Sequence, residues 1–310
     1  MAWCPSFPDD TLTMPAYLPL LSALTAIYLA WGGTYLAMAV AVRTIPPLLV
    51  SGLRFVTAGL LLLGFLALRR AAWPSAVQWR GAAISGTFLL LGGNGVVCCL
   101  AHLVPSGVVA LVIACTTLFV VLTSWLLGGP GPTRRVILGI LIGLAGIGLL
   151  VWHPGSQAPW PWWAPLGLLG ACASWGLGTV LSRRLPQPED PWMATAAQMV
   201  TGGGITLSLA TALGSWSGFD PSTISAASWW AWGYLVMVGA IIGFGAYVWL
   251  LRNASPALAT SYGYINPLVA LALGAGLNGE ELSGQTLIAA GIIVAGVVVL
   301  AFAPPPAQEA

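Results

Sequence analysis

The sequence predicts an all-α membrane protein whose ten transmembrane helices form two inverted repeats of five helices each. Three observations support this fold class. Of the 310 residues, 58% are hydrophobic and only 6% are charged, a composition that soluble globular domains do not have. The chain also contains ten apolar runs of membrane-spanning length, and its two halves resemble each other.

The apolar runs each contain about 20 residues, which at a rise of about 1.5 Å per residue are long enough to cross the hydrocarbon core of a bilayer. They cover residues 17–42, 48–68, 80–101, 105–127, 134–152, 162–182, 192–213, 229–251, 256–277 and 284–303. Short connections rich in proline and glycine separate them, so no soluble domain is inserted. A cleavable signal peptide requires basic residues before its apolar stretch, but the first 16 residues carry no lysine or arginine. The first run is therefore expected to remain as a helix.

The internal repeat equates positions in the two halves. Ser174-Trp175-Gly176 repeats Ala30-Trp31-Gly32, Pro191 repeats Pro47, Gln198 falls where Arg54 does, and Gly203 repeats Gly59. At a slightly larger offset, Ser255-Pro256-Ala257 repeats Val104-Pro105-Ser106, and Leu277-Asn278-Gly279 repeats Leu126-Leu127-Gly128. Because each repeat has an odd number of helices, the second enters the membrane from the opposite side, as in many alternating-access carriers. A duplicated bundle without transport activity is the alternative.

Arginines predict the orientation, because basic residues are retained on the cytoplasmic side of a membrane. With a cytoplasmic N-terminus, the cytoplasmic ends receive Arg69, Arg70, Arg80, Arg134, Arg135, Arg183, Arg184 and Arg252. The opposite side receives only Arg43 and, just inside the membrane, Arg54. Both termini are therefore expected in the cytoplasm. The predicted parts are a cytoplasmic segment (1–16), a first five-helix repeat (17–152), an outer linker (153–161), a second five-helix repeat (162–303) and a cytoplasmic tail (304–310).

Tryptophans gather at the predicted outer ends, where an indole suits the membrane interface. They are Trp152, Trp160, Trp162, Trp163, Trp216, Trp229, Trp230 and Trp232. We interpret them as an aromatic belt at the outer surface.

Several motifs resemble one family. The segment from Arg252 through Ser255-Pro256-Ala257, Tyr262, Tyr264 and Asn266-Pro267 to Gly279-Glu280 is similar to the last part of EamA-type members of the drug/metabolite transporter superfamily. Five motifs in the first half of this chain are similar to motifs at the same places in bacterial inner-membrane exporters of this kind. They are Trp31-Gly32, Pro46-Pro47, Arg54-Phe55, Gly93-Asn94-Gly95 and Val104-Pro105-Ser106-Gly107.

This resemblance implies a ten-helix fold in the bacterial inner membrane, with a central cavity between the halves. The helices carrying Pro105 and Pro256 would line that cavity, and the fifth and tenth helices would pack at the periphery. The implied activity is export of amino acids, related metabolites or amphipathic drugs. Many relatives carry an acidic residue about five positions before the Pro-Ser-Gly element, where this chain has Leu100, which argues against proton coupling through that position.

Polar residues inside apolar runs are the candidates for substrate binding, since burying them in a membrane is costly. Arg54 offers a guanidinium that can grip a carboxylate with two hydrogen bonds, or it can snorkel to the interface or bond backbone carbonyls. Gln198 is its repeat equivalent, and Asn94 lies among glycines near the middle of its run. Each amide can contact a substrate or join two helices by a hydrogen bond.

Aromatic residues add further candidates. Tyr262, Tyr264 and Asn266 precede Pro267, and the spacing of four places Tyr262 and Asn266 on one helix face. Trp31 and Trp175 lie at equivalent depths, where they can stack on a substrate or pack in the core. A weaker candidate is His102 near the outer surface, either as a group that senses pH at a gate or as a solvated terminal histidine.

The missing residue types narrow the function. No predicted span contains Asp or Glu, which disfavours ion coupling and an organic-cation substrate. Without lysine there is no phosphate-binding P-loop, and five cysteines without ligand spacing indicate neither a metal nor a disulfide framework. We therefore expect no cofactor, no metal, no nucleic-acid partner and no enzyme activity.

The leading hypothesis is an exporter of neutral or zwitterionic amino acids, including aromatic ones, and related amphipathic metabolites, working by facilitated diffusion or exchange. Two alternatives stay open: a proton-coupled multidrug exporter and, from another class, a membrane enzyme or sensor. The expected partners are a small-molecule substrate and the lipid bilayer, and the chain is expected to act as a monomer or a homodimer.

Overall fold

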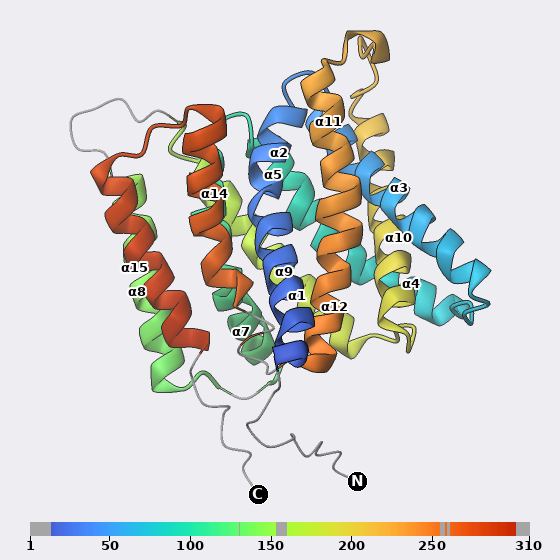
Figure 1. Ribbon diagram of the computed structural model, residues 1–310, viewed down its shortest axis with the longest axis horizontal. Helices are drawn as coiled ribbons and strands as arrows, with labels where there is room; N and C mark the ends of the chain where they lie inside the picture. Colours follow the sequence, from blue (N-terminus) through green and yellow to red (C-terminus); the bar gives the residue numbers. More distant parts are fainter. Residues whose placement is uncertain (1–13, 130, 153–159, 255–257, 259–260, 302–310) are drawn as a thin grey trace, which may run out of the picture.

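The computed structural model describes residues 14–129, 131–152, 160–254, 258 and 261–301, which form a bundle of helices without a strand in these ranges (Figure 1). The first half comprises α1 (Met14–Gly32), α2 (Thr34–Ala41), α3 (Pro47–Leu68), α4 (Ala76–Gly86), η1 (Thr87–Gly95), α5 (Val96–Leu100), α6 (Ser106–Ile113), α7 (Thr116–Leu126) and α8 (Arg134–Val151). The second comprises α9 (Ala164–Arg184), α10 (Pro191–Ala212), η2 (Pro221–Thr223), α11 (Ala226–Tyr234), η3 (Leu235–Ile242), α12 (Gly243–Asn253), α14 (Tyr262–Asn278) and α15 (Gly284–Ala301).

Helices that follow each other with little or no break form ten long rods in the described residues, as the apolar runs predict. Six rods are long and apolar enough to cross a membrane: Leu18–Ala41, Pro47–Leu68, Ala76–Leu100, Ser106–Leu126, Ala164–Arg184 and Ala226–Leu250. Gly284–Val299 is a shorter apolar helix. The start predicted for the ninth helix, at residue 256, lies outside the described residues, and α14 begins at Tyr262.

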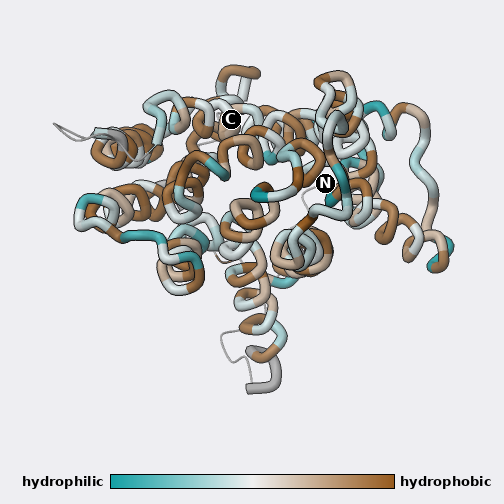
Figure 2. Tube along the Cα trace, turned by 90° about the horizontal axis from the view of Figure 1, so that it is seen from above, coloured by the Kyte–Doolittle hydropathy of each residue, from teal (hydrophilic) through white to brown (hydrophobic). Residues whose placement is uncertain are grey.

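Apolar side chains cover the outside of the bundle as well as its core. Hydrophobic residues predominate along the rods in an end-on view (Figure 2). Leu60, Leu61 and Phe65 of α3 are each more than half exposed. In water such a surface would be unfavourable, so its natural surroundings are lipid.

Glycines set the closest helix contacts. A Cβ at Gly59 of α3 would lie 2.7 Å from Val200 of α10, and one at Gly203 of α10 would lie 2.9 Å from the Val56 nitrogen. These two glycines occupy equivalent positions in the repeat. Because neither has a side chain, α3 and α10 can approach closely at both positions. Small residues allow such close backbone approach in membrane bundles.

α8 and α15 lie side by side at one edge of the bundle (Figure 1), as the family resemblance implies. They approach closely at two glycines. An added Cβ would lie 2.7 Å from Ile293 at Gly146, and 2.7 Å from the Gly143 backbone at Gly296.

The two ends of the bundle are distinguished by the chain ends. α1 begins and α15 ends at the same end of the bundle (Figure 1). We call the opposite end, where α2 and α14 finish and α11 begins, the upper end.

Two rods contain π-helices, which hydropathy alone did not predict. η1 interrupts the third rod and η3 interrupts the eighth, at corresponding places in the two halves. π-helical turns are rare and occur preferentially at functional sites. Both segments lie near the middle of their rods.

Candidate functional site

Arg54 is buried in the bundle without a partner for its charge. Its side chain is 4% exposed, and in the part of the chain that the structure describes neither Nε nor Nη1 has a hydrogen-bond partner. The guanidinium lies 4.2 Å from the centroid of the adjacent Phe55 ring, which gives only a partial compensation. Arg54 therefore neither reaches the membrane surface nor bonds a backbone carbonyl within the described residues.

The helix α3 puts Arg54 in this position. Pro47 at its start fixes a helical φ without losing a needed N–H, and from there Ser51, Arg54 and Ala58 follow along one buried face. Tyr35 of α2 and Cys98 of α5 lie within electrostatic range of the guanidinium. Every Asp and Glu of the described residues lies in a connection or at a helix cap, so none neutralises this charge.

Asn266 is a second buried group without a partner, in this case a hydrogen-bond acceptor. It is 5% exposed, and its Oδ1 has no hydrogen-bond partner among the described residues. It lies on α14 directly before Pro267, opposite Gly32 of α1, where an added Cβ would come within 3.4 Å of the Asn266 carbonyl oxygen. A buried acceptor without a donor is rare in native proteins and calls for an explanation.

Two more buried groups have no partner in the described residues, Oγ of Ser51 in α3 and Nε1 of Trp232 in α11. This indole packs on the cluster that contains Phe55, Met199 and Val236, and Phe55 is the ring that Arg54 covers. The sequence placed Trp232 in the interfacial belt, because it follows Trp229 and Trp230 at a helix start. Trp230 is 81% exposed, as a position in such a belt requires, whereas Trp232 is partly buried against this cluster.

Trp31 and Tyr262 are brought together in an aromatic cluster. Their ring centroids lie 4.8 Å apart in an edge-to-face arrangement, and Phe244 and Tyr247 of α12 lie 5.3 and 5.5 Å from the Trp31 ring. Trp31 Nε1 donates a hydrogen bond to the Gly239 carbonyl of η3 at 3.0 Å. The indole nitrogen therefore has a structural partner, while Trp31 and Tyr262 remain partly exposed.

Trp175 contacts the other π-helix. A Cβ on Gly93 of η1 would lie 2.8 Å from its ring, and the neighbouring Ser174 donates a hydrogen bond to the Phe88 carbonyl at 2.8 Å. Trp31 and Trp175, equivalent in the repeat, thus each pack on a π-helix of the opposite half. Asn94, also in η1, is partly exposed, and its side chain makes no hydrogen bond to the described residues, so it does not join helices there.

Gln198 joins helices by hydrogen bonds, which was the structural alternative to a substrate contact. Its Nε2 donates to Ser85 Oγ at 3.3 Å and to Gln187 Oε1 at 3.2 Å, joining α10 to α4 and to the connection after α9. Tyr264 packs against the main hydrophobic core. His102 is exposed just after α5. In the described residues, no hydrogen bond links any of these three side chains to Arg54, Tyr35 or Cys98.

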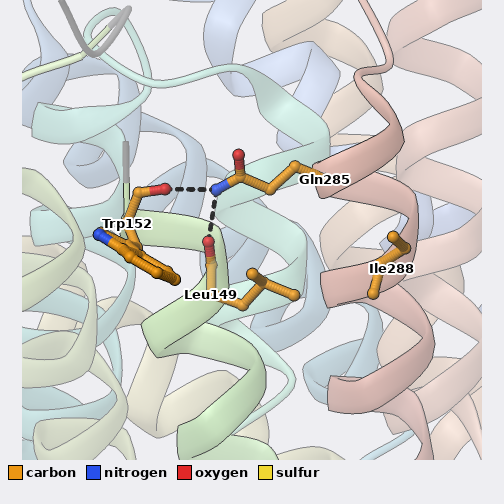
Figure 3. Close-up of a pocket in the computed structure, with 4 residues that line it drawn as sticks. All are labelled: Leu149, Trp152, Gln285 and Ile288. Carbon is orange, nitrogen blue, oxygen red and sulfur yellow. Dashed lines mark hydrogen bonds between the residues drawn. The ribbon is translucent and has the colours of Figure 1, made fainter. Parts of the chain in front are cut away.

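A cavity of about 310 Å³ lies elsewhere, between α8 and α15 at the edge of the bundle (Figure 3). It is lined by Leu149, Trp152, Gln285 and Ile288. Gln285 Nε2 donates to the carbonyls of Leu149 and Trp152, so its donors are satisfied. None of these four lining residues is charged and the Gln285 donors are already bonded, so we place the candidate site at Arg54 and Asn266 instead.

Known proteins share both the sequence and the fold. The EamA-like transporter family matches residues 18–152 and 162–302. The "Uncharacterized inner membrane transporter YedA" of Escherichia coli strain K12 is 43% identical over 275 residues, which cover 86% of this chain and 85% of that protein. The "Probable amino-acid metabolite efflux pump" of Salmonella typhimurium is 24% identical, covering 83% of this chain and 86% of the relative.

A protein of known crystal structure superimposes with a TM-score of 0.61 over 91% of this chain and 96% of its own, at 22% identity, so it shares the fold. The two successive family matches indicate duplicated halves, and neither the family nor the relatives named above are enzymes. This multi-pass membrane protein therefore belongs to the EamA-like transporter family.

Proposed function

We propose that this transporter exports amino acids, aromatic ones in particular, and related small metabolites across the inner membrane. The observation that carries this proposal is the pair of buried groups without partners, Arg54 with free donors and Asn266 with a free acceptor. A guanidinium binds a carboxylate through two parallel hydrogen bonds, and an amide oxygen accepts one from an ammonium group. An α-amino acid carries both complementary groups on one carbon atom.

The elements between the two groups are consistent with a shared site. Tyr35 of α2 lies within electrostatic range of Arg54 and also of Tyr262, which is one helical turn before Asn266. A buried guanidinium without an anion is unfavourable by several kcal/mol, so a bound carboxylate stabilises the loaded carrier. A zwitterion satisfies both groups without bringing a net charge into the membrane.

The rings of Trp31, Tyr247 and Tyr262 supply an aromatic wall next to this position. Aromatic side chains favour edge-to-face neighbours, which supports a substrate with a ring of its own. The name of the Salmonella relative, an amino-acid metabolite efflux pump, agrees with this substrate class. Trp175 and Asn94 on the opposite half are proposed as further substrate contacts.

The proposed mechanism is alternating access between two inverted five-helix repeats, residues 17–152 and 162–303, with both termini in the cytoplasm. Ten rods return the chain to its starting side, and Arg69, Arg70, Arg183 and Arg184 lie exposed at the end assigned to the cytoplasm. In this orientation the upper end is the outer end. Facilitated diffusion or exchange is proposed because the described rods embed no carboxylate that carries a coupling ion.

Binding to purified protein tests the proposal. We expect phenylalanine or tryptophan to raise the unfolding temperature of the wild type, and Arg54→Gln to weaken binding at least about tenfold through loss of charged hydrogen bonds. Arg69→Gln, on the same helix but exposed, should bind like the wild type. Equal affinity of Arg54→Gln and wild type would remove the basis of the proposed site.

Transport in proteoliposomes tests the mechanism. Preloaded unlabelled substrate should accelerate entry of labelled aromatic amino acid, as exchange requires, and an imposed pH gradient should leave the rate unchanged. Strong acceleration by the gradient would favour the proton-coupled multidrug exporter instead.

A further inference from the structure

A carboxylate from the second half caps a helix of the first half at the upper end of the bundle. Glu280 Oε1 accepts hydrogen bonds from the Ser106 backbone N–H at 2.9 Å and from Ser106 Oγ at 2.7 Å. Oε2 accepts from the Gly107 N–H at 3.2 Å. Asn278 Nδ2 donates to Oε1 at 3.1 Å, and Arg43 Nη2 donates to Asn278 Oδ1 at 2.6 Å. We call these five residues the outer latch.

The latch replaces the cap that α6 lacks. The residue before α6 is Pro105, which has no side chain that can bond the first N–H groups of the helix. A carboxylate at this end also interacts favourably with the helix dipole. The cap comes from a residue 174 positions away in the sequence, so it contributes to holding α6 and α14 together as well as to starting α6.

Glycines permit this geometry. Gly279 ends α14 in the left-handed conformation, with φ of 66°, which turns the chain back so that the Glu280 N–H bonds the Gly274 carbonyl. A Cβ at Gly274 would lie 2.5 Å from Glu280 Oε2, and one at Gly107 would lie 2.6 Å from Leu271. Side chains at these positions would push the carboxylate off α6 or separate α6 from α14.

The latch crosses between the two halves at one end only. Arg43, Ser106 and Gly107 belong to the first half, and Asn278 and Glu280 to the second. The repeat that equates Gly279 with Gly128 equates Glu280 with Gly129, so the corresponding position near the other end has no side chain. The carboxylate is partly exposed, and water can replace its bonds when the ends separate.

We infer that Glu280 is a gating residue, which holds the outer ends of α6 and α14 together while the outer side is closed and releases them when the carrier opens outward. This inference rests on the alternating-access mechanism and the orientation proposed above, and not on the identity of the substrate. Because the latch has no equivalent carboxylate in the first half, its removal shifts the resting equilibrium toward the outward-open state.

Thiol labelling of the full chain in membrane vesicles tests this role. Two reporters replace buried residues in a background whose native cysteines are alanine. The first is Leu271→Cys in α14, at the α6 contact, and the second is Ser261→Cys directly before α14, whose side chain contacts Tyr28 of α1 toward the opposite end. An impermeant maleimide is added to right-side-out vesicles for the first reporter and to inside-out vesicles for the second.

Glu280→Ala is expected to raise outside labelling at position 271 about tenfold, as loss of one hydrogen bond to a charged group would, and to lower inside labelling at position 261. Glu281→Ala, which removes the exposed neighbouring carboxylate, should change neither rate. A rise at both reporters would mean a loosened fold, and no change at either would mean a cap without a gating role; each result overturns the inference. No substrate is added, so a reciprocal shift would stand even if amino-acid binding failed.

Discussion

Replacing Arg54 by methionine should stabilise the empty transporter while it abolishes substrate binding. Methionine has a similar length and can fill the same space, but it leaves no buried charge and no free N–H group. Replacing buried charges by apolar residues of similar volume is often neutral or stabilising by about 1–4 kcal/mol. Arg54 is a strong case because it is 4% exposed and two of its nitrogens have no hydrogen-bond partner.

The size of the effect follows from two opposing contributions. Each unsatisfied buried donor is unfavourable by about 1–3 kcal/mol, so removing two gains roughly 2–6 kcal/mol. Loss of the contact with Phe55, at 4.2 Å, costs about 1–2 kcal/mol. The net gain is therefore about 0–5 kcal/mol. It corresponds to a rise in unfolding temperature of roughly 2 °C or more for each kcal/mol in a chain of this size.

The assay is thermal unfolding of purified protein in detergent, with and without substrate. The matched control is Arg69→Met, since Arg69 lies 5.0 Å from the Phe65 ring on the same helix but is exposed. This control should change stability by less than about 0.5 kcal/mol. If Arg54→Met lowers the unfolding temperature of the empty protein, Arg54 has a structural partner in the empty state and the reasoning is refuted.

Two further predictions concern the other partners of the site. Asn266→Leu should lower the affinity for phenylalanine to the affinity for 3-phenylpropionate, which lacks the ammonium group, and should leave the affinity for 3-phenylpropionate unchanged. Calorimetric titration measures both affinities, and an equal fall in the two would contradict the prediction. Gly243→Ala should destabilise the protein by about 1–3 kcal/mol, because the new Cβ would overlap Nε1 of Trp31 and break its bond to Gly239. Gly233→Ala is the control, because no atom lies within 4 Å of its added Cβ. Equal unfolding temperatures for the two variants would contradict the prediction.

Hydropathy was sufficient to predict the rods, because length and apolar content depend on the local sequence alone. It did not predict the π-helices, since which hydrogen bonds a helix makes also depends on what packs against it, such as Ser174 on η1. Most rod ends agree with the predicted ones to within a few residues. The start predicted for the ninth helix, residue 256, lies outside the described residues and stays a prediction.

The candidate site was predictable in part. Arg54 stood out because an arginine within an apolar run is rare, but its lack of a partner is a property of the folded bundle. The repeat pointed to Gln198, yet equivalent backbone positions do not have equivalent neighbours, and Gln187 and Ser85 bind its amide. Glu280 lies in the turn after α14, as predicted for the ninth helix, but its bonds to Ser106 join residues far apart in the sequence.

The paired π-helices also bear on how the chain arose. π-helices make up well under 1% of residues in proteins, so two at corresponding places are more simply inherited from one ancestral five-helix chain than acquired twice. Each π-helix is contacted by a tryptophan of the opposite half, Trp31 on η3 and Trp175 on η1. A single ancestral chain could not have made this contact with itself in the same way. A five-helix ancestor would therefore have needed a second copy of itself to supply these contacts, which the duplicated chain supplies within one polypeptide.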